Sequence, residues 1–131
     1  MIKKTVATAT MLIALAGCEV PTEDAGDDFT RVTDAATFQT AVVGRNLNNV
    51  NDPASMFFRL NADGTMSGDV GRGALAGTWA FRDGYWCRTW TAGLKPESLN
   101  SEDCQLVELG AGQVALSRER GAGNRGIYVI Q

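Results

Sequence analysis

The residue types best suited to chemistry in this sequence are tryptophan, arginine and cysteine, and they gather between residues 77 and 90. This segment, GTWAFRDGYWCRTW, holds all three tryptophans of the chain and one of its three cysteines. Indole rings and a guanidinium group can line a ligand cavity, where the arginine would meet an anionic ligand. The four side chains that could form such a site are Trp79, Trp86, Arg88 and Trp90.

A purely structural role is the competing interpretation of these side chains. An aromatic-rich strand more often belongs to a hydrophobic core than to a pocket. Arg82 and Arg88 would then be outward-facing strand residues, or would stack on indole rings. From the sequence alone we favour packing over a pocket, with both arginines either outward-facing or stacked on indole rings.

Catalytic residues are scarce. The chain has no histidine, which removes the commonest general base and every serine–histidine–acid triad. Its acids mostly flank expected turns, as do Asp52, Asp63 and Asp83, and 97–103 forms part of a long polar loop. An enzyme would need two carboxylates that the fold brings together, as in glycosidases. We therefore predict a protein without enzymatic activity.

Cofactor and metal motifs are also weak. The segments 71–77 (GRGALAG) and 121–126 (GAGNRG) approach or fit the G-x-G-x-x-G pattern, but a dinucleotide site needs a helix directly after the glycines. We interpret both as turns and expect no cofactor. The segment 61–64 lacks the spaced ligands of a calcium loop, and no C-x-x-C spacing exists, so no metal site is expected either.

Two strands must position the aromatic residues. Trp79 and Phe81 alternate with small or polar residues, and Asp83-Gly84 tolerates the positive φ of a tight hairpin turn. In the second strand Trp86, Arg88 and Trp90 share one face, and Tyr85, Cys87 and Thr89 share the other. Both faces carry large groups, so the pattern leaves open which of them faces the core.

The rest of the chain predicts a small, mainly β domain. Thr33 or Asp34 can cap a short helix that ends near Gly44. The expected strands are 45–50, 55–61, 65–70, 74–82, 85–91, 103–109, 113–118 and 127–130. Short strands separated by turn residues indicate an antiparallel meander of seven or eight strands that closes as a barrel or sandwich. The helix would plug or cover one end.

The first eighteen residues resemble an export signal. Two lysines precede an apolar run that is too short to span a bilayer as a mature helix. The run ends in Leu15-Ala16-Gly17-Cys18, which resembles the lipobox of bacterial lipoproteins. That resemblance implies cleavage after residue 17 and a lipid anchor on Cys18, whereas an ordinary secretory signal with an incidental cysteine is the alternative. The expected location is the cell envelope, facing the periplasm or the exterior, on a membrane that the sequence does not identify.

Net charge and cysteine content limit the classes of possible partner and indicate a disulfide. Loss of residues 1–17 removes two lysines and no acid, which takes the net charge from −3 to −5. Five acids fall within 19–28, so 18–28 is expected to be an acidic, solvated tether. The remaining residues, 29–131, are expected to form a single domain of zero net charge. A domain without excess positive charge is an unsuitable partner for nucleic acid. With Cys18 acylated, Cys87 and Cys104 are the remaining thiols, and an oxidising compartment favours a disulfide between them.

The residues G-x-W at 77–79, D-G-Y-W-C-R at 83–88 and C-Q at 104–105 resemble a group of small exported bacterial proteins. The resemblance covers about 29–131 and implies a fold and a disulfide rather than an activity. Some members are named dihydrodipicolinate reductase, but this chain is too short for a nucleotide domain plus a catalytic domain and lacks that enzyme's histidine-rich segment. The domain is more loosely similar to lipocalin-like barrels and to small periplasmic barrel inhibitors of proteases.

Three functions are therefore compared below. The first is a non-catalytic module that binds a small ligand or an envelope component. The second is a protein-interaction module, such as a periplasmic protease inhibitor or an assembly partner. The third is an enzyme. A tryptophan-lined cavity would favour the first, an exposed apolar patch the second, and two buried carboxylates at reacting distance the third.

Overall fold

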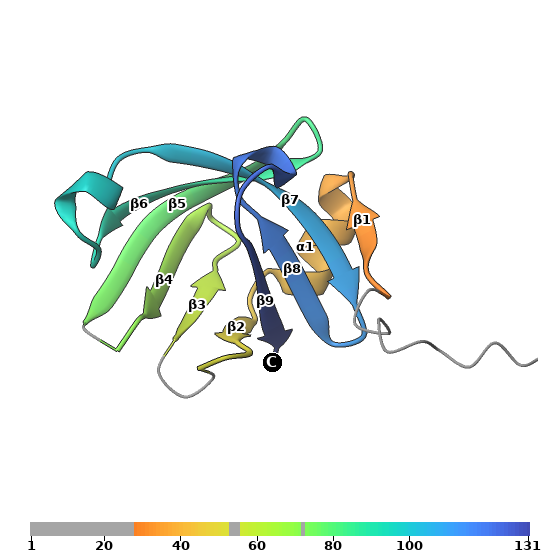
Figure 1. The fold of residues 1–131 in the computed structure, drawn as a ribbon, viewed down its shortest axis with the longest axis horizontal. Helices are drawn as coiled ribbons and strands as arrows, with labels where there is room; N and C mark the ends of the chain where they lie inside the picture. The colour runs from red at the N-terminus through yellow and green to blue at the C-terminus, as the bar shows by residue number, and fades with distance from the viewer. Residues whose placement is uncertain (1–27, 53–55, 72) are drawn as a thin grey trace, which may run out of the picture.

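Eight antiparallel strands close into a barrel in the computed structural model, which describes residues 28–52, 56–71 and 73–131 (Figure 1). Strands β2 to β9 follow one another around the barrel, and β9 returns to pair with β2, where Ile130 lies opposite Leu47. A ninth strand, β1, extends the edge of β7, with Thr30 opposite Leu109. The predicted fold class, a small mainly β meander barrel with one helix, is confirmed.

The elements in chain order are β1 (Thr30–Val32), α1 (Ala35–Val42), β2 (Asn46–Asn49), β3 (Phe57–Leu60), β4 (Thr65–Asp69), β5 (Ala74–Arg82), β6 (Tyr85–Ala92), η2 (Pro96–Ser98), β7 (Glu102–Gly110), β8 (Gln113–Ser117), η3 (Glu119–Gly121) and β9 (Arg125–Ile130), where η marks a 3-10 helix. All eight predicted strands are present, with ends that differ by up to two residues. Strand β1 and both 3-10 helices were not predicted, because three-residue elements carry no measurable period.

Closure of the barrel places one face of every strand in the interior, so alternate side chains along each strand point inward. The buried apolar side chains contributed by the strands and the helix are Val32, Phe38, Val42, Leu47, Phe58, Leu60, Met66, Leu75, Trp86, Trp90, Val107, Val114 and Leu116. Trp86 and Trp90 belong to this set, so the face of β6 that also carries Arg88 is the interior one.

Helix α1 plugs one end of the barrel. The carboxylate of Asp34 accepts a hydrogen bond from the backbone N–H of Thr37 at 2.9 Å, which satisfies a donor of the first turn. One turn apart on the same face, Phe38 and Val42 are at most 1% exposed. The ring of Phe38 lies 5.0 Å from that of Phe81, centroid to centroid, so the helix packs on the end of β5. The expected position of the helix at one end is confirmed.

The hairpin between β5 and β6 shows why its two glycines are required. Asp83 and Gly84 have φ values of 54° and 81°, which suits a two-residue turn with both central residues left-handed. At the other end of β5, a Cβ on Gly77 would lie 2.5 Å from the carbonyl oxygen of Thr89 and 3.1 Å from the ring of Trp90. Gly77 therefore leaves the space that the indole of Trp90 occupies.

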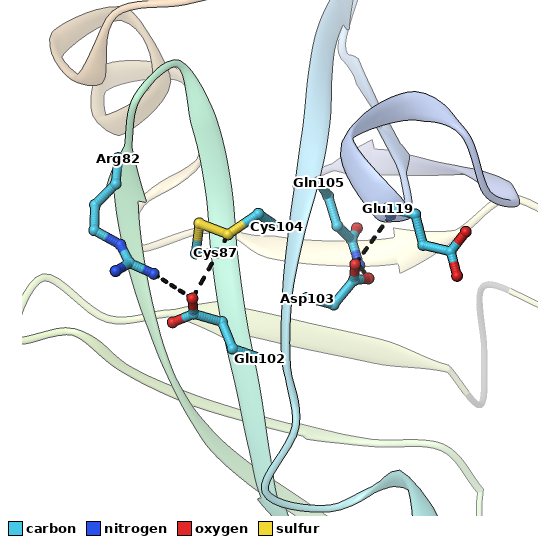
Figure 2. Close-up of a disulfide and its surroundings, with 7 residues drawn as sticks. All are labelled: Arg82, Cys87, Glu102, Asp103, Cys104, Gln105 and Glu119. Carbon is cyan, nitrogen blue, oxygen red and sulfur yellow. Dashed lines mark hydrogen bonds and ion pairs between the residues drawn. A yellow bond between two sulfur atoms is a disulfide. The ribbon is translucent and has the colours of Figure 1, made fainter.

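A disulfide joins the two central strands on the other face of β6. Cys87 and Cys104 are direct neighbours in the β6–β7 pair and are bonded, as predicted. Figure 2 shows Cys104 and Glu102 on one side of β7, with Asp103 and Gln105 on the opposite side. The sulfurs and the Glu102 carboxylate lie within 4.8 Å of one another, but bonded sulfurs are not the thiolates that bind a metal.

None of the helices in the described parts of the chain is long and apolar enough to cross a membrane. The predicted signal segment, Cys18 and nearly all of the predicted acidic tether lie outside the described residues.

Replacing either cysteine by serine should destabilise the domain by about 3 kcal/mol, because the bond closes a loop of 17 residues in the unfolded chain. The double variant should be no less stable than either single variant, since all three lack the same bond. Urea unfolding of the oxidised protein measures this. Independent, additive losses would contradict the pairing.

Candidate ligand-binding cavity

A cavity of about 350 Å³ opens into the barrel at the end opposite α1. Strands β3 and β5 to β9 contribute its walls, and residues of the loops before β7 and β9 line its mouth. Its side chains divide into an aromatic group (Phe57, Phe58, Trp86, Trp90, Tyr128), an aliphatic group (Met56, Val70, Leu75, Leu94, Leu116) and a polar group (Arg88, Gln105, Arg118, Asn124, Arg125), with Gly126 completing the wall.

Phe58 is the centre of the aromatic wall. Its ring is nearly parallel to that of Trp86, with centroids 5.8 Å apart and an angle of 13° between the planes. Trp90 and Tyr128 meet Phe58 edge to face, at centroid distances of 6.0 and 5.0 Å. Such pairs fix the orientation of the rings, so the cavity has stiff, flat walls.

Arg88 lies inside the barrel beside an indole ring, so of the two packing positions considered for it the outward one is excluded. It is 8% exposed, and its guanidinium carbon lies 5.9 Å from the ring centroid of Trp90. The strand register explains this position. Arg88 and its neighbour Cys87 point to opposite faces of β6, and Arg88 lies directly opposite Asp103 on β7. Burial lowers the pKa of Arg88 from its ordinary value, with Asp103 opposing and Arg118 reinforcing that shift. The group nevertheless keeps its charge at neutral pH.

Asp103 holds the polar side of the cavity together. Its Oδ2 lies 3.5 Å from a terminal nitrogen of Arg88 and accepts a hydrogen bond of 2.8 Å from the amide of Gln105. Its Oδ1 accepts a hydrogen bond of 3.0 Å from the backbone N–H of Glu119, at the start of η3. The dashed contacts of Figure 2 show the Asp103 carboxylate between Gln105 and Glu119. One carboxylate thus fixes a buried cation, a buried amide and the loop at the mouth.

Tyr128 adds a neutral hydroxyl to the wall. Burial raises the pKa of its phenol above the ordinary value, while a hydrogen bond with Asn49 and the charges of Arg118 and Arg88 act in the opposite direction. The phenol is therefore protonated at neutral pH and is a poor general base.

The indole nitrogen of Trp86 is the unusual atom of the cavity. Trp86 is 2% exposed, and among the described residues no acceptor lies within hydrogen-bond distance of its Nε1. Leaving a buried donor without an acceptor costs about 1–3 kcal/mol. The nitrogen is covered by protein atoms, so it lies behind the cavity wall and is not open to the cavity.

Three of the four predicted site residues meet in this cavity, namely Trp86, Arg88 and Trp90. The fourth does not, because Trp79 lies near α1, 5.8 Å from the ring of Phe38, and donates from its indole nitrogen to the carbonyl oxygen of Asn61. Arg82 is outside the barrel, as expected, and pairs with Glu102 at 2.5 Å with both side chains about half exposed.

Sequence reasoning missed four other residues of the site. Phe58 and Tyr128 sit in strands that were predicted, and their alternation with neighbours could have suggested an inward position. Gln105 lies opposite Trp86 and Asp103 opposite Arg88, but this register becomes visible only when the β6–β7 pairing is known. Asp103 was interpreted as an acid beside a turn, and the structure corrects this to a partner of Arg88.

Comparisons with protein-family models, with curated proteins and with solved structures find no match for this chain.

Asp103→Ala should lower the free energy of unfolding by about 2–3 kcal/mol, because it leaves Arg88 buried without its counter-charge. The expected loss of stability is smaller than that for breaking a fully buried ion pair, because the Asp103 side chain is 18% exposed. Glu102→Ala is the matched control on the opposite face of β7, and its exposed pair with Arg82 contributes at most about 1 kcal/mol. Urea unfolding compares the two, and equal losses would contradict the role given to Asp103.

Proposed function

We propose that this chain is an envelope lipoprotein whose barrel binds a small, mainly apolar ligand and catalyses no reaction. The observation that carries the proposal is the open, aromatic-walled cavity with a buried polar array at Arg88. Ligand sites in proteins combine a mostly apolar lining with a few placed polar groups in this way. The ligand could be a small molecule or part of an envelope component.

The surface favours this proposal over a protein-interaction module such as a protease inhibitor. Val50, at 36%, is the one large hydrophobic side chain that counts as exposed in the described part of the chain. Docking sites for proteins are usually marked by larger apolar patches. The apolar surface that is open to a partner lies inside the barrel instead.

Two features support a non-catalytic role. The sequence has no histidine, and the described residues that line the cavity include no carboxylate. The cavity thus lacks the usual general bases, and the raised pKa of Tyr128 makes its phenol unsuitable for that role.

Binding can be tested with N-phenyl-1-naphthylamine, a neutral apolar probe whose fluorescence rises in a dry site. We expect saturable binding of one probe per chain, and about tenfold weaker binding by Trp90→Leu, which removes an aromatic wall. The control is Val50→Ala, which removes an exposed apolar side chain and should leave binding unchanged. If Val50→Ala weakens binding and Trp90→Leu does not, the probe reports an outer surface and the proposal is wrong.

The anchor is tested separately. Cys18→Ala should move the protein from the membrane fraction to the soluble periplasmic fraction, because the acyl chains supply the membrane affinity, about 0.8 kcal/mol per buried methylene. Fractionation and immunoblotting measure the distribution, and Val20→Ala is the control that keeps the cysteine. A Cys18→Ala protein that stays with the membrane would argue against a lipid anchor.

A further inference from the structure

We propose that the ligand of the barrel is an aromatic carboxylate, a flat apolar molecule with one negative charge that is bound by Arg88. This inference rests on the proposed binding function and specifies its ligand class. Three features of the cavity lead to it: the sign of its charge, the donors that it leaves available, and the shape of its walls.

The charged side chains of the cavity are all positive. Arg88, Arg118 and Arg125 line it, and no acid does so among the described lining residues. Only Arg88 is buried, whereas Arg118 and Arg125 are exposed, and Arg125 already pairs with Glu108 at 3.4 Å. The ion pairs with Asp103 and Glu108 balance two of these three positive charges, so the excess is one positive charge, which matches one negative charge on the ligand.

Arg88 has donors left for a ligand. A guanidinium carries five N–H donors, and the ionic contact of Arg88 within the described structure is one of 3.5 Å to Asp103. That distance exceeds the 2.7–2.9 Å typical of a charge-assisted hydrogen bond. The Asp103 oxygens also accept hydrogen bonds from Gln105 and Glu119, which keep the carboxylate in place when a ligand binds the other donors of Arg88.

Trp86 offers the ligand its ring and not its N–H. Its indole nitrogen is covered by protein atoms and has no acceptor among the described residues, so a molecule in the cavity does not reach it. Trp86 and Arg88 are two residues apart on the interior face of β6, and both line the cavity. A carboxylate has two oxygens with several lone pairs and can accept from two donors of Arg88 at once.

The walls select a flat body for this acid. Phe58, Trp90 and Tyr128 present rings at fixed angles, and an aromatic ligand gains about 0.5–1.5 kcal/mol per ring pair beyond its buried area. The volume of about 350 Å³ is at the small end of the range of roughly 300–1,000 Å³ for ligand sites. A molecule of one or two rings fits these limits better than a long flexible amphiphile.

The test uses two probes of the same shape, 2-naphthoate and its neutral amide 2-naphthamide, together with aliphatic decanoate. Binding to the mature protein is measured by calorimetry at neutral pH. We expect 2-naphthoate to bind at least about tenfold more tightly than 2-naphthamide and than decanoate. Arg88→Met should abolish the preference for the acid over the amide, whereas Arg82→Met, which removes an exposed arginine of the neighbouring strand, should keep it.

Arg88→Met leaves Asp103 without its cation, so the double variant R88M/D103N, which removes both charges, is measured beside it. Equal affinity for 2-naphthoate and 2-naphthamide in the native protein would overturn the charge assignment and leave the proposed binding function intact. Tighter binding of decanoate would overturn the aromatic assignment. Failure of all three probes, with N-phenyl-1-naphthylamine still bound, would overturn this inference alone, and failure of all four would overturn the proposed function too.

Discussion

Pairing of β9 with β2 is the constraint on which the rest of this structure depends. It closes the meander, removes the exposed sheet edges that an open sheet would leave, and turns the period-two pattern of each strand into an inside and an outside. In an open sheet the two faces of β6 could have exchanged roles. In the closed barrel Trp86 and Arg88 must face inward, and Cys87 must face away from the cavity. The disulfide and the candidate site are therefore consequences of one closure.

The two ends of the barrel are filled by different means. At one end Phe38 of α1 is inserted against the end of β5, so apolar packing closes it. At the other end the walls carry Arg88, Gln105 and Tyr128, and their polar atoms need partners that an apolar plug could not supply. Asp103 is the partner of both Arg88 and Gln105, and it also accepts a hydrogen bond from the backbone of Glu119, which fixes η3 at the mouth. A cavity can persist there because the polar end is held open by hydrogen bonds rather than filled by side chains.

Local signals in the sequence were sufficient for most of the fold. Turn residues and alternation located every barrel strand, Asp83-Gly84 located the hairpin, and Thr33-Asp34 indicated the start of α1, where Asp34 is the cap. The interior face of β6 could not be chosen, because large side chains occur on both faces and the decision depends on pairings far apart in the chain. Trp79 was grouped with the other tryptophans by sequence proximity. It lies opposite Arg88 in the β5–β6 pair, but its ring packs against Phe38 of α1, a contact that the sequence does not reveal.

The polar interior has a cost that stability alone does not explain. Replacing a buried ion pair by apolar residues of similar volume is often neutral or stabilising, and a buried indole donor without an acceptor is unfavourable. A barrel selected only for its core would therefore place apolar residues at 88 and 103. The conformation of η3 adds to this cost, because Glu119 and Arg120 both adopt positive φ, at 53° and 55°, beside Asp103. Strained backbone beside a buried ion pair is a feature of sites that act on another molecule. Their coincidence at one mouth supports the proposal that the open end of this barrel serves a ligand.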